Sequence, residues 1–186
     1  ETGIEKDMLG LAAYFSRFEV TIAHFVPSVL RSYVDASDPA LVVAPRHVVC
    51  SGEALPQQLV ADFLRFGHVL WNLYGPTEAS VDVTGRRVCA QQCNIGFPAS
   101  NTSLVVLSSL GHALPEGLVG ELCFGGPQLA IGYHGKPDRT AESFIPDNRG
   151  ARLYRTGDLG KVLADGSVEY IGRADFQVKI RGFRIE

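Results

Sequence analysis

A buried strand runs directly into a polar loop in Val69-Leu70-Trp71-Asn72-Leu73-Tyr74-Gly75-Pro76-Thr77-Glu78. Residues 69–73 are mostly apolar and β-forming, which predicts a strand. Gly75 and Pro76 then force a turn. In parallel α/β sheets, ligands bind at the loops that leave the carboxyl ends of the strands. We therefore expect a ligand site at this loop.

The segments before this strand alternate between helical and extended patterns. Apolar residues recur at helical spacing from Met8 to Phe18, and the β-rich residues 20–26 follow. The next expected elements are a helix over residues 28–34, a strand over residues 46–50 and a helix over residues 55–66. This alternating order favours a parallel sheet with helices packed on it.

After about Asn94 the sequence changes to short β-rich segments separated by turns rich in glycine, proline and serine. The expected strands cover residues 103–107, 119–124, 161–163 and 168–171. Asp165-Gly166 lies between the last two and is a strong hairpin signal. The pattern predicts a small antiparallel or barrel-like unit.

The composition is that of a globular chain without a strong charge. The 186 residues are 46% hydrophobic, enough to bury a core. There are 17 basic and 20 acidic side chains, and the formal net charge of −3 argues against nucleic acid or an anionic membrane as partner. No apolar run reaches the length of a membrane span, and residues 1–7 lack the features of a signal peptide. We expect a cytoplasmic protein that binds a small molecule.

The four cysteines give no sign of a metal site. Cys50, Cys89, Cys93 and Cys123 form no C-x-x-C pair, so we do not expect zinc. Cys50 and Cys123 lie in apolar runs, which predicts buried and unreactive thiols.

The polar loop offers two groups suited to a nucleotide. Thr77 can donate its hydroxyl to a phosphoryl oxygen, and Glu78 provides the hard oxygen ligand that Mg²⁺ prefers. The alternative is an ordinary strand-to-helix turn with Glu78 in the first helical turn, which composition alone favours.

Residues 72–78 resemble a motif of the adenylate-forming, AMP-binding superfamily, and most closely that of the adenylation domains of nonribosomal peptide synthetases. Further stretches resemble this family's motifs in its order and near its spacing: residues 51–55, 120–122 with 125–126 and 132–133, 154–158, and 172–186. One departure is Ile131, which stands before Gly132-Tyr133 where the family usually has arginine.

The resemblance implies an α/β fold that forms part of the large N-terminal subdomain of such an enzyme. Residues 1–93 would hold the sheet with the nucleotide and substrate-pocket loops, residues 94–174 a β-rich part with the ribose-binding loop, and residues 175–186 the hinge, at Asp175, and the start of the C-terminal subdomain. The family's phosphate loop, its aspartate for the substrate amino group and its C-terminal catalytic lysine have no counterpart in these residues, so we expect the chain alone to be inactive.

The resemblance also assigns roles to individual residues. Thr77 and Glu78 would be catalytic, meeting the α-phosphate and Mg²⁺, with Glu78 as the metal ligand. The implied nucleotide-binding residues are Gly52, Glu53, Ala54, Asn72, Tyr74, Asp158, Tyr170, Arg173 and Lys179. Asp158 suits two ribose hydroxyls and Arg173 suits ribose or phosphate. The alternatives are a turn cap for Asp158 and a solvated surface charge for Arg173.

The implied reaction joins a substrate carboxylate to the α-phosphate of ATP, releases pyrophosphate and leaves an acyl-adenylate. A second step would pass the acyl group to phosphopantetheine on a peptidyl carrier domain of the same synthetase. The implied amino-acid pocket, which resembles that of serine-activating domains, consists of His24, Val49, Ser51, Leu73, Val81 and Asp82.

Two other functions stay open. The first is an acyl-CoA or aryl-acid ligase of the same superfamily, against which the polar Asp82 argues. The second is a degenerate adenylation-like scaffold without activity, against which Thr77, Glu78 and Asp158 argue. For the pocket, the alternatives are a capped core histidine at His24 and an exposed strand residue at Asp82.

Overall fold

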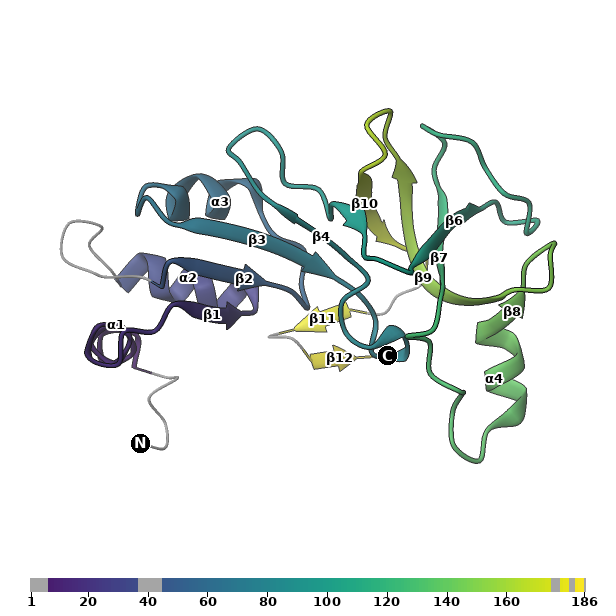
Figure 1. The fold of residues 1–186 in the computed structure, drawn as a ribbon, viewed down its shortest axis with the longest axis horizontal. Helices are drawn as coiled ribbons and strands as arrows, with labels where there is room; N and C mark the ends of the chain where they lie inside the picture. Colours follow the sequence, from purple (N-terminus) through teal and green to yellow (C-terminus); the bar gives the residue numbers. More distant parts are fainter. Residues whose placement is uncertain (1–6, 37–44, 175–177, 181–182, 186) are drawn as a thin grey trace. The chain divides into compact units, whose positions relative to one another are not determined.

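The computed structural model describes residues 7–36, 45–174, 178–180 and 183–185, drawn as the coloured ribbon of Figure 1. The chain divides into two compact units. The first comprises Glu1–Asn72, Arg87–Cys93 and Val178–Ile185, and the second comprises Leu73–Arg86 and Asn94–Gln177. The expected domain limits of 1–93, 94–174 and 175–186 stay a prediction, and Asp175 lies outside the described residues.

The first unit contains the parallel sheet that the sequence predicts. Strands β1 (Ile22–Phe25), β2 (His47–Cys50) and β3 (Val69–Tyr74) pair in parallel, with β2 between the other two. Helices α1 (Met8–Arg17), α2 (Pro27–Ala36) and α3 (Gln57–Leu64) connect or precede them (Figure 1). The βαβ order explains the parallel pairing, because a helix provides the crossover that brings the chain back to the same end of the sheet.

Local chemistry fixes where these helices begin. The Asp7 side chain accepts a hydrogen bond from the Gly10 backbone N–H at 3.0 Å and caps α1. Pro27 opens α2, where the lack of a backbone N–H has no cost. Leu30 of α2 and Phe63 of α3 pack into one core with Val48, and all three side chains have no exposed surface.

The second unit is mainly antiparallel, as predicted. Its main sheet has the order β10-β9-β7-β6, and a further short strand, β8, pairs with β9. These strands are β6 (Ser103–Leu107), β7 (Gly120–Gly125), β8 (Phe144–Pro146), β9 (Arg152–Val162) and β10 (Val168–Arg173). Over the described residues this sheet is open, with β10 and β6 at its edges, so the barrel-like part is not a closed barrel.

Shorter elements complete the fold. β4 (Thr84–Arg87) pairs antiparallel with β5 (Phe97–Pro98), and α4 (Pro137–Ser143) leads directly into β8. A 3₁₀ turn, η2, spans Thr77–Ala79. β11 (Val178–Ile180) and β12 (Phe183–Ile185) form an antiparallel pair.

The Asp165-Gly166 hairpin is confirmed between β9 and β10. The Asp165 carboxylate accepts a hydrogen bond from the Ser167 backbone N–H at 2.9 Å, and Gly166 adopts φ +80°. The Leu163 N–H donates to the Ser167 carbonyl at 2.8 Å and closes the turn. A residue without Cβ takes this left-handed conformation without strain, so the local sequence is sufficient to specify the turn.

One strand is longer than the sequence predicts. The expected strand covered residues 161–163, whereas β9 has 11 residues and includes the stretch 154–158. Its Gly157 lies at an irregularity within the β7–β9 pair.

The two apolar cysteines behave as predicted. Cys50 and Cys123 are fully buried, and burial is the largest cause that raises the pKa of each thiol to about 12. Among the described residues, no helix has both the length and the apolar character needed to cross a membrane.

Candidate functional site

The loop after β3 folds back on itself and requires glycine at position 75. A Cβ on Gly75 would lie 2.3 Å from the backbone oxygen of Val81, far inside contact distance. The Val83 N–H donates to the Tyr74 carbonyl at 2.8 Å, which closes the loop. Ser80 and Val81 both adopt positive φ, at 59° and 76°. Positive φ is unfavourable for a β-branched residue such as Val81, so the loop holds a strained backbone of the kind that gathers at functional sites.

Glu78 is the buried carboxylate of this loop. Its side chain is 8% exposed, and the Tyr133 hydroxyl donates a hydrogen bond to its Oε1 at 2.6 Å. The Glu78 carbonyl accepts a hydrogen bond from the Ala130 N–H at 2.8 Å. Burial, the hydrogen bond with Tyr133 and the charge of Glu78 raise the pKa of neighbouring Tyr154 above its ordinary range. Thr77, the other predicted catalytic residue, is exposed beside it.

Arg152 fixes the segment that carries Tyr133. Its guanidinium donates hydrogen bonds to the carbonyls of Ala130 and Ile131, the latter at 2.6 Å. The Tyr133 N–H donates to Thr140 Oγ1 at 2.9 Å. The side chain of Ile131, at the position where arginine is usual, is 96% exposed. An arginine from β9 therefore binds this segment through its backbone.

The donor set at Glu78 fits Mg²⁺. This ion is usually held by one or two carboxylates together with phosphate oxygens of the substrate, and it keeps several waters. Glu78 provides one carboxylate and Thr77 a nearby hydroxyl, both hard oxygen groups. In the part of the chain that the structure describes, His, Cys, Asp and Glu side chains do not gather in groups of three or more at metal-binding distance.

A second group of predicted residues meets around Asp158. The Tyr74 hydroxyl donates a hydrogen bond to Asp158 Oδ2, and Arg173 Nη1 donates to Asp158 Oδ1 at 3.0 Å. The ring centroids of Tyr74 and Tyr170 are 6.1 Å apart. Asp158 is 7% exposed. Burial, followed by the charge of Asp158, raises the pKa of Tyr74 well above its ordinary value, so Tyr74 remains a protonated donor.

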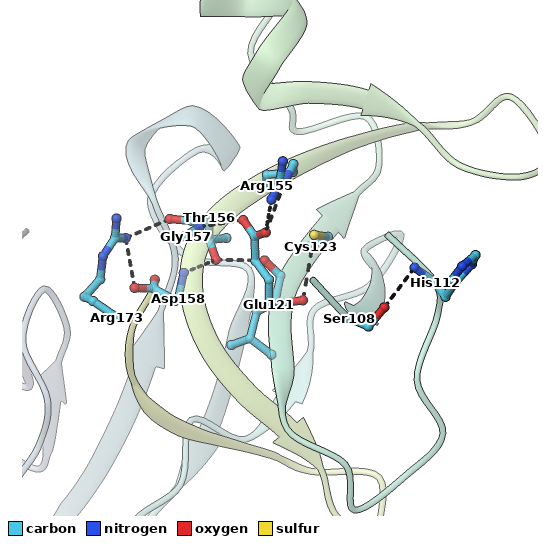
Figure 2. A network of polar contacts seen from close by, with 10 residues as sticks. Ser108, His112, Glu121, Cys123, Arg155, Thr156, Gly157, Asp158 and Arg173 are labelled. Atoms are coloured by element: carbon cyan, nitrogen blue, oxygen red, sulfur yellow. Dashed lines mark hydrogen bonds and ion pairs between the residues drawn. The ribbon is translucent and has the colours of Figure 1, made fainter. Parts of the chain in front are cut away.

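Figure 2 shows how β9 presents Asp158. Arg173 Nη1 also donates to the Thr156 carbonyl at 2.7 Å, and the Asp158 N–H donates to Thr156 Oγ1 at 2.9 Å. The Gly157 N–H donates to Glu121 Oε1 at 3.0 Å. The alternatives were a turn cap for Asp158 and a solvated surface charge for Arg173. Neither describes this arrangement, because the two side chains pair within a network inside the sheet.

Three predicted pocket residues lie together in the first unit. His24 Nε2 and Ser51 Oγ are 2.7 Å apart, and His24 is paired in register with Val49 across β1 and β2. His24 is exposed and Ser51 is buried, so His24 is not a core histidine. Gly52 follows with φ +86°.

Glu53, predicted to bind nucleotide, holds the start of helix α2. Its Oε2 accepts a hydrogen bond from the Ser28 backbone N–H at 2.9 Å, and its Oε1 accepts one from the Ser28 hydroxyl at 3.1 Å. A carboxylate at a helix N-terminus is stabilised by the unpaired N–H groups and by the helix dipole. These contacts give Glu53 a structural role.

We therefore predict that Glu53→Ala loosens α2. Loss of the cap should cost about 1 kcal/mol, which is a roughly fivefold faster hydrogen exchange of the α2 backbone amides. The measurement is hydrogen–deuterium exchange of the complete protein, with Glu116→Ala, at an exposed turn residue, as control. Unchanged exchange in α2 together with a raised KM for ATP would assign Glu53 to the nucleotide instead.

The other predicted residues have varied environments. Asn72 is 3% exposed within β3, whereas Val81 is 56% exposed. Ala54 is exposed, and Leu73 and Asp82 are half-buried, so Asp82 is not the exposed strand residue of the alternative. The side chain of Lys179 lies outside the described residues.

Tyr133 and Glu121 also belong to the site, although the sequence patterns assigned them no role. The signal that could have identified them is that both lie in stretches that resemble family motifs. Tyr133 is 55 residues from Glu78, and Glu121 is 36 residues from Gly157, so local patterns contain no information on these contacts.

The fold is that of an adenylation domain. PA1221, described as an NRPS protein containing adenylation and PCP domains, superposes with a TM-score of 0.88 at 30% identity, over 96% of this chain and 33% of that one. The Vibrio cholerae adenylation domain AlmE, solved with glycyl-adenosine-5'-phosphate, superposes with a TM-score of 0.84 at 30% identity, over 93% of this chain and 35% of that one.

The chain belongs to the family of AMP-binding enzymes, whose sequence model matches residues 3–134. Enterobactin synthase component F of Shigella flexneri is 43% identical over 201 residues, which covers all of this chain and 16% of that protein. Vanchrobactin synthetase VabF of Vibrio anguillarum is 44% identical over 198 residues, covering 97% of this chain and 7% of that protein. The chain thus spans a small part of the synthetases that it matches.

Proposed function

We propose that this chain is part of an adenylation domain that uses ATP and Mg²⁺ to activate L-serine as its aminoacyl-adenylate. The observation that carries this proposal is the Tyr74–Asp158–Arg173 cluster in a member of the AMP-binding family. It joins the end of β3, through Tyr74, to a buried carboxylate on β9, and a bound nucleotide would contact both.

The cluster suits the sugar and base of ATP. A carboxylate has about four lone pairs, and the bonds from Tyr74 and Arg173 use one on each oxygen of Asp158. The remaining lone pairs can accept the two ribose hydroxyls. Tyr170 and Tyr74 offer flat aromatic faces to the adenine, and Asn72 provides an amide for its edge.

The reaction needs positioning and charge stabilisation more than a reactive side chain. A carboxylate oxygen of the amino acid bonds to the α-phosphorus while the bond from that phosphorus to the pyrophosphate oxygen breaks. Thr77 would donate its hydroxyl to an α-phosphate oxygen, and Glu78, oriented by Tyr133, would hold Mg²⁺. When bound, Mg²⁺ neutralises part of the charge on the phosphate oxygens. These residues would reduce the barrier because they are held in place before the substrate arrives.

Two relatives support an amino acid as the substrate and a carrier domain as the partner. AlmE was solved with an aminoacyl nucleotide, and PA1221 contains a PCP domain beside its adenylation domain. By analogy, the activated amino acid would pass to phosphopantetheine on a peptidyl carrier domain, with neighbouring synthetase domains as further partners.

The proposal of serine depends on the polar pocket residues. The His24–Ser51 hydrogen bond of 2.7 Å supports a site that can bond a hydroxyl. The resemblance adds Asp82 as a further acceptor and assigns Val49, Leu73 and Val81 to the walls. A site built to bond a substrate hydroxyl rejects analogues that lack it, because its own polar groups are then left unpaired.

We predict that the complete protein prefers serine to alanine by about 5–150-fold in kcat/KM, since an unpaired buried polar group costs about 1–3 kcal/mol. Threonine, which adds one methyl, should be disfavoured by about 10–200-fold. Asp82→Ala should reduce serine activation more than alanine activation. The measurement is pyrophosphate exchange with each amino acid.

The same experiment separates the competing functions. Preference for a large hydrophobic amino acid would refute the serine pocket and leave amino-acid activation intact. Exchange dependent on a fatty or aryl acid would indicate the ligase alternative, and no exchange with any acid would indicate the scaffold.

A further inference from the structure

The strand pair β7–β9 contains a bulge that includes Asp158. Glu121 pairs with Leu159 and Cys123 with Arg155, so two steps along β7 correspond to four steps along β9. Residues 156–158 of β9 lie opposite the single residue Leu122 of β7, so they cannot follow the regular ladder of hydrogen bonds. Bulges of this kind bend a strand and re-aim its side chains, often beside active sites.

Side chains replace the missing ladder bonds in the bulge. The Thr156 hydroxyl donates to the Leu122 carbonyl at 2.7 Å and accepts the Asp158 N–H at 2.9 Å. Gly157 has φ +70°, and a Cβ there would lie 2.7 Å from Arg173 Nη2. Its N–H donates to Glu121 Oε1 at 3.0 Å, so Glu121 provides the acceptor that β7 would otherwise offer through its backbone.

Arg155 holds the other oxygen of the same carboxylate. Its Nε and Nη2 both donate to the single oxygen Glu121 Oε2, at 3.0 and 2.6 Å, as charge-assisted hydrogen bonds (Figure 2). The Glu121 side chain is 14% exposed, whereas that of Arg155 is 49% exposed. Glu121 is therefore fixed at both oxygens, one by Arg155 and one by the bulge.

We infer that Glu121 is a positioning residue that sets the bulge and thereby aims Asp158 at the ribose hydroxyls of the nucleotide. It does so without contact to the nucleotide, through the Gly157 N–H. This inference rests on the proposed function, because it takes Asp158 as the ribose ligand.

The test compares ATP with 2',3'-dideoxy-ATP in pyrophosphate exchange by the complete protein. In Glu121→Ala the apparent KM for ATP should rise about tenfold, whereas the KM for the dideoxy nucleotide should change less than twofold, because only ATP uses Asp158 through its ribose hydroxyls. A lost preference for ATP over the dideoxy nucleotide indicates that Glu121 positions Asp158. A general loss of protein stability would instead change the exchange with both nucleotides alike.

Further variants separate the role of each bond. Glu121→Gln keeps an acceptor for Gly157 and should retain most of the preference for ATP. Glu121→Asp keeps the charge but shortens the reach, so it should behave like Glu121→Ala, and it replaces that variant if alanine prevents folding. Arg155→Met should give a smaller loss in the same direction. The control is Glu169→Ala, which removes the ion pair with Lys161 on the same sheet, 3.1 Å in length, and should change neither KM.

The last variant combines Glu121→Ala with Asp158→Asn. Because Glu121 acts through Asp158, the double variant should have the same preference for ATP over 2',3'-dideoxy-ATP as Asp158→Asn alone. If wild-type protein exchanges pyrophosphate and prefers ATP, but both Glu121→Ala and Glu121→Asp keep that preference, the inference is wrong and the proposed function stands. Absence of exchange in the wild-type protein with every acid would instead remove the proposed function.

Discussion

Replacing Glu78 by glutamine should lower kcat for pyrophosphate exchange in the complete protein by about 10²–10³-fold, the usual loss when one preorganised electrostatic group is removed. Glutamine has nearly the same shape and can still accept the Tyr133 hydroxyl, now 2.6 Å from Glu78 Oε1. The change removes the negative charge that would hold Mg²⁺. The defect should therefore appear in the chemical step and in the Mg²⁺ concentration needed for half-maximal exchange.

The matched control is Glu142→Gln, which makes the same change on the exposed surface of α4. It should leave kcat and the Mg²⁺ requirement unchanged. Thermal unfolding of both variants should match the wild-type protein, because neither change creates a cavity. Wild-type exchange by a well-folded Glu78→Gln protein would exclude Glu78 from the metal site.

Asp158→Ala should raise the apparent KM for ATP by about 10–100-fold. The ribose hydroxyls would lose a charged acceptor, and a hydrogen bond to a charged group contributes about 1.5–3 kcal/mol. The variant also removes the partner of Arg173, 3.0 Å away, and of the Tyr74 hydroxyl. Some loss of stability should therefore accompany the loss of nucleotide binding.

Asp158→Asn separates these two effects. Asparagine retains the shape and one acceptor oxygen, so stability should be largely restored while the KM for ATP stays raised. Asp138→Asn, at an exposed position in the first turn of α4, is the control and should change neither quantity. An Asp158→Asn protein with wild-type KM for ATP and for 2',3'-dideoxy-ATP would contradict the assignment of Asp158 to the ribose.

Local sequence patterns were sufficient to predict the parallel sheet and the hairpin between β9 and β10. The alternation of helical and extended patterns before Val69 predicted the parallel sheet, because a crossover helix leaves few other ways to pair the strands. Asp165-Gly166 predicted its hairpin, because the turn is closed by the Leu163 N–H and the Ser167 carbonyl, which are near neighbours in the chain. Residues 72–78, with the other motifs, identified the family.

The sequence was less informative about β9. The expected strand covered residues 161–163 and left residues 154–158 without an assigned element. The structure instead has a bulged strand there, and the bulge depends on Glu121, Thr156 and the register of β7 against β9. Sequence patterns report the preference of each residue, whereas a bulge is a property of two paired strands.

The sequence by itself determined the order of helices and strands up to Tyr74, the family and the residue types at the site. Only the tertiary structure decided which side chains meet: Tyr74 with Asp158 across 84 residues, and Glu78 with Tyr133 across 55. It also showed that Glu53 accepts a hydrogen bond from the start of α2. The physical reason is that these contacts follow from strand register and from the packing of buried groups. Each is set by many residues at once and leaves no periodic pattern in the chain.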